Sequence, residues 1–177
     1  EVCYADADGD GYTDGSTVSS TDTDCDDSGE ADDTVSTGEC DDDDSSVNPG
    51  VASDGANCVD DDCDGSVDED ASYTYTHDSD IQSIWTSTCA TCHTSSSSGG
   101  LSLTSAYSKI VNVASSDVPT MDLVDDTCDT NDSYIWHKLK GTQASVGGAG
   151  STMPKSGSIS SSDLAKIQTW IEEGAPN

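Results

Sequence analysis

The chain has 177 residues, with 36 acidic side chains, 5 basic ones and a formal net charge of −31. A charge of this sign excludes nucleic acid as a partner, because the phosphate backbone is also negative. The sequence holds no apolar stretch of membrane-spanning length. Because the sequence begins at Glu1 with no signal-peptide pattern, we expect a processed exported chain, and eight cysteines favour an oxidising location outside the cytoplasm.

The negative charge is concentrated in residues 1–70, which contain 25 acidic side chains and no Lys or Arg. A segment with so few large apolar residues cannot fold by burying them. It is either an acidic disordered tail or an array scaffolded by cations. We therefore expect two domains, an Asp-rich module at 1–70 and a second domain at 71–177.

The spacing of the carboxylates favours the cation array. Two loops carry Asp at positions 1, 3, 5 and 9 with Gly at position 6, as oxygen-coordinated calcium requires. The first loop comprises Asp6, Asp8, Asp10 and Asp14, with Tyr12 at position 7. The second comprises Asp60, Asp62, Asp64 and Asp68. Magnesium suits these loops less well, because it prefers fewer carboxylates and keeps its waters.

Both loops lack the bidentate Glu that completes such a site at position 12, where Thr17 and Ala71 stand. Flanking helix patterns are also missing, so the loops are not true EF-hands. We expect the remaining ligands to come from the neighbouring Asp-rich runs. The candidates there are Asp24, Asp26, Asp41 and Asp43.

The Asp-rich module resembles thrombospondin type 3 repeats and related Asp/Cys-rich metal-binding repeats of bacterial surface proteins. The matching strings are residues 40–44 with 47–50, and residues 62–65 with 67–69. The resemblance implies an irregular segment in which calcium takes the place of a hydrophobic core.

The second domain carries a C-x-x-C-H motif at residues 89–93. In this motif two thiols one helical turn apart attach a haem c, and the following His is the proximal iron ligand. A structural disulfide and half of a zinc site are the alternatives, but no second Cys/His pair follows at zinc-ligand spacing. We expect Cys89, Cys92 and His93 to bind haem.

The sixth iron ligand requires a thioether or an imidazole. Met153 lies 60 residues after His93, between a Gly/Ser loop and Pro154, which is a poor context for a core residue. A Met ligand favours reduced iron and raises the potential. Met121, His77 and His137 are the alternatives.

Four helices are expected in the second domain. A helix beginning at Asp78 or Ser79 places Ile81, Ile84, Trp85, Cys89 and Cys92 on one face, toward the haem. A weaker helix covers 104–113, another begins at Asp132 or Ser133 and ends at Gly141, and the last begins at Ser160 with Asp163 completing a capping box. Gly/Ser loops at 95–100 and 147–151 join them.

Residues 73–177 resemble a class I cytochrome c of a subtype common in bacterial surface and periplasmic proteins. The matching strings are 80–85, 133–141, 153–154 and 167–177, around the motif at 89–93. The resemblance implies a mainly α cytochrome c-like domain, preceded here by the calcium- and disulfide-stabilised acidic repeat segment. It also implies thioether bonds at Cys89 and Cys92, a proximal His93 and a distal Met153, and it makes His137 an ordinary helix position.

The six other cysteines form an even set, with five in the acidic module and Cys128 in the second domain. If all are oxidised, at least one disulfide joins the two domains or two chains; the alternative is a free thiol on each side. We expect an extracellular, cell-surface or periplasmic electron carrier with a redox partner and calcium-bridged self-association. A structural filament with secondary haem, and a peroxidase-like enzyme, are the other hypotheses.

Overall fold

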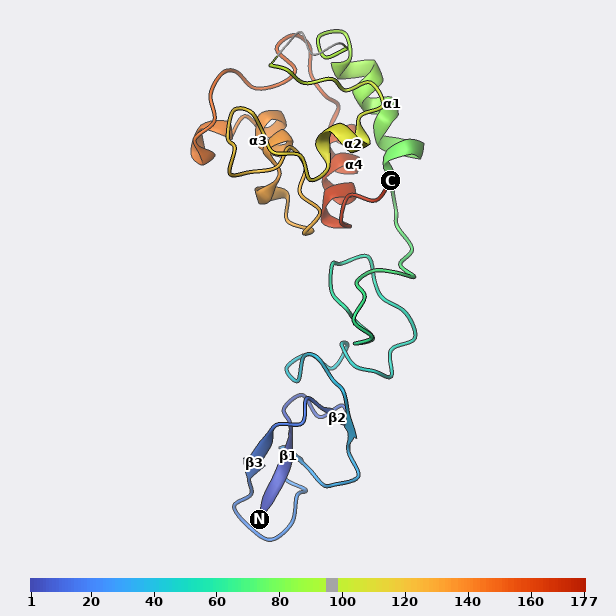
Figure 1. The fold of residues 1–177 in the computed structure, drawn as a ribbon, viewed down its shortest axis with the longest axis vertical. Coiled ribbons are helices and arrows are strands. Elements are labelled where there is room, and N and C mark those ends of the chain that lie inside the picture. The colour runs from blue at the N-terminus through green and yellow to red at the C-terminus, as the bar shows by residue number, and fades with distance from the viewer. Residues whose placement is uncertain (95–98) are drawn as a thin grey trace. The chain divides into compact units, whose positions relative to one another are not determined.

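A computed structural model describes residues 1–94 and 99–177, so residues 95–98 of the expected 95–100 loop lie outside the described residues. The chain divides into two compact units, Glu1–Ser72 and Tyr73–Asn177 (Figure 1).

The first unit is built on five short strands. These are β1 (Val2–Asp6), β2 (Tyr12–Thr13), β3 (Thr17–Ser19), β4 (Gly29–Ala31) and β5 (Ser36–Thr37). Strand β1 lies between β3 and β4 in an antiparallel sheet, whereas β2 and β5 form a separate parallel pair. In that pair Thr13 lies opposite Thr37, so the chain leaving β5 is held beside the end of β2.

Residues 38–72, all of which the structure describes, form neither helix nor strand. Their aspartates accept hydrogen bonds from backbone N–H groups two residues ahead. Asp41 accepts from Asp43 (3.2 Å) and Asp44 accepts from Ser46 (3.1 Å). Such Asx turns satisfy the backbone locally and compete with regular secondary structure.

Disulfides crosslink the chain. Cys3 pairs with Cys25 and Cys40 pairs with Cys63. Cys58 and Cys128 are disulfide-bonded as well, so the alternative of two free thiols is wrong. Three disulfides fit a secreted or extracellular protein, because such bonds persist in oxidising compartments.

Helices in the second unit are short. The π-helical turns η1 (His77–Ile81) and η2 (Trp85–Cys89) flank α1 (Gln82–Ile84), and α2 follows at Tyr107–Ile110. The remaining elements are η3 (Thr130–Asp132), α3 (Tyr134–Lys140), η4 (Gln143–Val146) and α4 (Ser161–Glu172). Helix α4 packs against η1.

The predicted helix boundaries at α3 and α4 are confirmed. Helix α3 ends at Gly141, whose φ of +76° is the left-handed conformation that favours glycine. At the start of α4 the Ser160 hydroxyl accepts a bond from the Asp163 N–H (3.0 Å) and donates one to its carboxylate (2.7 Å).

The core of the second unit is an apolar cluster of the protein's own side chains. Trp85 and Trp170 are fully buried in it, and the Trp170 indole donates a hydrogen bond to the Pro176 carbonyl (2.8 Å). The apolar face expected to lie against haem, including Ile81 and Ile84, belongs to this cluster. Burial of large aromatic side chains thus gives a chain without Phe its core.

The prediction of a mainly α cytochrome c-like fold is wrong. Helix accounts for only about 25% of the chain and strand for about 12%, with four short α-helices among the described residues. The expected helix at 104–113 contracts to the four residues of α2, because Val111 leaves it in an extended conformation. Long Ser, Thr, Asp and Gly segments form turns instead, since their side chains bond the nearby backbone.

Within the described parts of the chain, no helix has the length and apolar character needed to cross a bilayer.

The capping of α4 yields a stability prediction. Ser160→Ala removes the side-chain acceptor of the Asp163 N–H and should lower the free energy of unfolding of the second unit by about 1 kcal/mol. Urea denaturation followed by tryptophan fluorescence measures this, because all three Trp residues lie in that unit. Ser158→Ala, at an exposed position before the cap, is the control and should change the free energy little. Equal effects of the two substitutions would show that the cap is not a stabilising interaction.

Candidate functional site

The first Asp loop is preorganised by its own backbone. Asp6, at the end of β1, accepts hydrogen bonds from the N–H groups of Gly9 (2.8 Å), Asp10 (3.1 Å) and Gly11 (3.2 Å). The Asp10 N–H also donates a hydrogen bond to Asp8 (3.0 Å). The turn requires a positive φ of +93° at Gly11, which glycine adopts at little cost.

This backbone arrangement gathers the carboxylates. Oxygens of Asp6, Asp8 and Asp10 lie within 4.8 Å of one another, so together they can hold a metal ion. Oδ2 of Asp8 is buried and has no hydrogen-bond partner. Burial raises the pKa of Asp8, and the neighbouring Asp10 and Asp6 carboxylates add to this effect, while the Asp10 N–H opposes it.

Glu39 approaches this loop from a distant part of the sequence. The parallel pairing of β2 with β5 continues past the strands, where the N–H groups of Gly38 and Glu39 both bond the Thr13 carbonyl (3.2 and 3.4 Å). The next residue, Cys40, is fixed by its disulfide to Cys63. Glu39 is thereby held on both sides.

The environment of the Glu39 carboxylate is unfavourable for a lone anion. Glu39 is only 6% exposed, and neither carboxylate oxygen has a hydrogen-bond partner. Burial is the main reason that its pKa rises to about 7, and the neighbouring charges of Asp10, Asp8, Asp42 and Asp6 raise it further.

The second Asp loop repeats the hydrogen bonds of the first. Asp60 accepts from the N–H groups of Asp64 (3.0 Å) and Gly65 (2.9 Å), as Asp6 does from Asp10 and Gly11. Gly65 has a φ of +96°. Two groups of carboxylates lie close enough together to hold a metal ion and share one residue: Asp54, Asp60 and Asp62, and Asp62, Asp64 and Glu69.

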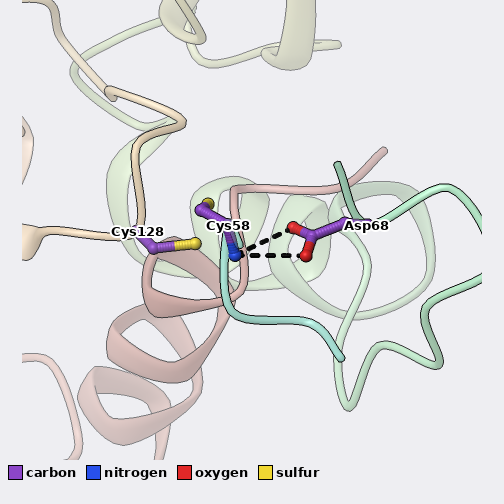
Figure 2. Close-up of side chains that lie close together, drawn as sticks. All are labelled: Cys58, Asp68 and Cys128. Atoms are coloured by element: carbon purple, nitrogen blue, oxygen red, sulfur yellow. Dashed lines mark hydrogen bonds between the residues drawn. The ribbon is translucent and has the colours of Figure 1, made fainter. Parts of the chain in front are cut away.

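Position 9 of each loop serves the backbone instead. Asp68 accepts hydrogen bonds from the Cys58 N–H with both carboxylate oxygens, at 3.1 and 3.2 Å (Figure 2). Asp14 is exposed and accepts a bond from Ser16 N–H (2.7 Å). Among the described residues, neither Asp14 nor Asp68 belongs to the same group of potential metal ligands as the Asp residues at positions 1, 3 and 5 of its loop. Tyr12 begins β2, and its N–H bonds Asp10 Oδ1 (2.8 Å).

Four Asp residues were expected to supply the missing ligands. All four are exposed, and none belongs to a group of described residues that is close enough to hold a metal ion. They are Asp24, Asp26, Asp41 and Asp43. Hydrogen bonding with Asp26 and Asp22 raises the pKa of Asp24 to about 6. The sequence analysis missed Asp42, which accepts a bond from Ala7 N–H (3.0 Å) beside the first loop, and it also missed Glu39, Asp54 and Glu69.

The C-x-x-C-H motif forms one tight turn after η2. The N–H groups of Cys92 and His93 both bond the Cys89 carbonyl (3.1 Å each), and the His93 carbonyl accepts a bond from Leu103 N–H (2.7 Å). Cys89 is buried and Cys92 is exposed. Burial, with a smaller contribution from Cys92, raises the pKa of the Cys89 thiol to about 11.

The donor set of this turn fits a covalently attached haem. The two cysteines lie three residues apart, at the two ends of one hydrogen-bonded turn. The imidazole that follows is half-buried, and its Nδ1 is buried without a hydrogen-bond partner. An orphaned buried nitrogen carries a desolvation cost that a ligand or a rearrangement on binding would relieve.

The structure separates the alternatives for the sixth ligand. Met153 is half-buried, and its N–H bonds the Lys138 carbonyl of α3 (2.8 Å). Both ring nitrogens of His137 have partners, Thr142 Oγ1 (2.8 Å) and the Asn131 carbonyl (2.9 Å). His137 therefore has no ring nitrogen left to bind iron and has a structural role.

The other two alternatives lie in different surroundings. His77 is buried in contact with the rings of Tyr107 and Trp170, and burial lowers its pKa. Met121 lines an open depression of about 310 Å³ together with Asp122, Asp125 and Asp132, among other residues.

Comparison with known proteins found no match among family models, curated proteins or solved structures. The resemblances to cytochromes c and thrombospondin type 3 repeats therefore stay predictions from the motifs themselves.

The raised pKa of Glu39 predicts a pH dependence in cation-free protein. The folded state holds this proton up to about pH 7, whereas an ordinary Glu loses it near 4.5, so the folded state binds more protons between these values. The stability contributed by Glu39 is fully present below about pH 4.5 and is lost as the pH rises through 7.

Hydrogen–deuterium exchange in chelator, corrected for intrinsic exchange rates, measures this dependence. Protection of peptides covering residues 1–40 should fall from pH 5 to pH 8 in the wild type and fall less in Glu39→Gln, which cannot ionise. Identical pH profiles for the two proteins would mean that Glu39 does not titrate in this range.

Proposed function

We propose that this chain is an exported electron carrier that holds one haem c through Cys89, Cys92 and His93. The observation that carries the proposal is the C-x-x-C-H motif, whose turn is closed by the Cys92 and His93 N–H groups on the Cys89 carbonyl. The six cysteines outside the motif are disulfide-bonded. In an oxidising compartment, two neighbouring thiols readily form a disulfide, whereas thioether bonds to a haem would consume both.

The protonation of Cys89 argues against a thiol–disulfide exchange enzyme, which is the other common use of a C-x-x-C pair. Such enzymes need a thiolate, and their reactive Cys has a lowered pKa. The Cys89 thiol is buried and its pKa is raised to about 11, so it stays protonated at neutral pH.

The axial ligands then define the role of the site. His93 would supply an imidazole and Met153 a thioether to hold the iron, and with both bound the iron would have no open site for substrate. A haem held in this way supplies a one-electron couple, and the thioether raises its potential. Electron transfer to a redox partner protein or acceptor is favoured over peroxidase-like catalysis.

Calcium bound in the first unit is the second part of the proposal. Two loops of the same hydrogen-bond pattern gather carboxylates in a unit with no Lys or Arg. Calcium accepts six to eight oxygen ligands and tolerates irregular geometry. We place the protein at the cell surface or outside the cell, where calcium-bridged contacts would also permit self-association.

Intact-mass spectrometry of protein matured in a host that assembles c-type cytochromes tests the haem proposal. Wild-type protein, reduced and denatured, should retain the mass of one haem, because thioether bonds resist both treatments. Cys89→Ser with Cys92→Ser should lack it. Cys3→Ser with Cys25→Ser removes a disulfide pair instead and should keep the haem. A wild-type mass without haem, beside a control cytochrome that acquires it, would contradict the proposal.

The sixth ligand can be tested by substitution. Met153→His should keep the haem low-spin but lower its potential, because imidazole stabilises ferric iron relative to a thioether. Potentiometric titration with absorption spectra measures both properties. If Met153→Ala leaves spectrum and potential unchanged while His77→Ala alters them, Met153 is not the ligand. Met121→Ala is the matched control and should change neither.

A further inference from the structure

We infer that Glu39 is the ligand that completes the first calcium site. It would take the role that the bidentate Glu at position 12 has in other calcium loops. The inference rests on the proposal that the first unit binds calcium. It assigns a residue 33 positions away from Asp6 to a site whose own sequence lacks a closing ligand.

Unpartnered oxygens are the first support. Both oxygens of Glu39 and Oδ2 of Asp8 are buried without a hydrogen-bond partner. Buried polar atoms in folded proteins nearly always have one, so these three orphaned carboxylate oxygens call for a missing partner. The charges of the first loop and of Asp42 raise the pKa of Glu39, so its carboxylate lies within electrostatic reach of these groups.

Charge identifies the kind of partner. The first unit contains no Lys or Arg, so within this unit only the amino terminus can supply a positive charge, and it is exposed and bonds the Asp22 carbonyl. Water would satisfy single hydrogen bonds but would leave the carboxylates repelling one another. A divalent cation satisfies the orphaned oxygens and cancels the repulsion in one step.

Ligand number favours calcium over magnesium. Asp6, Asp8, Asp10 and Glu39 offer four carboxylates, and an oxygen that accepts one N–H bond still has a lone pair for a metal ion. Calcium takes this many carboxylate oxygens, whereas magnesium keeps several waters and demands octahedral geometry.

Such a site would also connect distant segments. Glu39 follows β5 and precedes the disulfide-bonded Cys40, while Asp6 ends β1. A cation held by both would fix the end of β1 to the chain at the Cys40–Cys63 crosslink. Glu39 would then act as a metal ligand and as the point where the site joins the rest of the unit.

Calcium titration of the full-length chain by isothermal calorimetry at pH 7 tests the inference. Glu39→Gln keeps the size of the side chain and should weaken one calcium-binding step roughly tenfold or more, which is the lower end of what metal sites lose when their surroundings are altered. Asp33→Asn, an exposed position that loses the same charge, should bind calcium as the wild type does. Magnesium should bind the first site more weakly than calcium.

Asp60→Asn distinguishes failure of the inference from failure of the calcium proposal. It should weaken binding at the second loop and leave the step that depends on Glu39. If wild-type protein binds calcium and Glu39→Gln binds it equally, the inference is wrong and the calcium module stands. If the wild type binds no calcium, both fail. Hydrogen–deuterium exchange in chelator at pH 5 is the control for folding. If Glu39→Gln is folded, protection of residues 1–40 should match that of the wild type.

Discussion

The first unit depends on neutralising the carboxylates that its backbone brings together. Asx turns bring Asp6, Asp8 and Asp10 together, their charges act on the buried Glu39, and the unit contains no Lys or Arg to balance them. Uncompensated, these charges oppose the compact state. The disulfides Cys3–Cys25 and Cys40–Cys63 limit how far the unit can expand, but they do not cancel charge. In the proposed function, a bound cation would take the place of the missing hydrophobic core.

The second unit is stabilised in the ordinary way, by burial. Trp85, Trp170 and the isoleucines around them form a closed apolar cluster, to which Cys89 also belongs. The C-x-x-C-H turn therefore lies at the edge of a core that the protein builds from its own side chains. In the proposed function, haem attached there would adjoin this core, and a thioether at the buried Cys89 would be its inner anchor.

Local features could be read from the sequence, whereas long-range ones could not. The Ser160 cap, the Gly141 stop and the two Asp loops depend on residues a few positions apart, and the structure contains all of them. The mainly α fold was wrong because the periodic segments are short and Ser, Thr and Asp turns separate them. Glu39 was missed because the parallel pairing of β2 with β5 leaves no local pattern. The sequence did contain one signal for Glu39. The first loop lacks a Glu at position 12, and residues 1–70 contain only four Glu residues that could replace it.

The central claim is that cations, and not burial, hold the first unit together. A two-dimensional amide NMR spectrum of the full-length protein, recorded with saturating calcium and again after chelation at pH 7, tests it most directly. The account predicts that resonances of residues 1–72 lose their dispersion on chelation, while those of 73–177 keep theirs. If the dispersion of residues 1–72 is the same with and without calcium, the first unit is stable without a cation and the account is wrong.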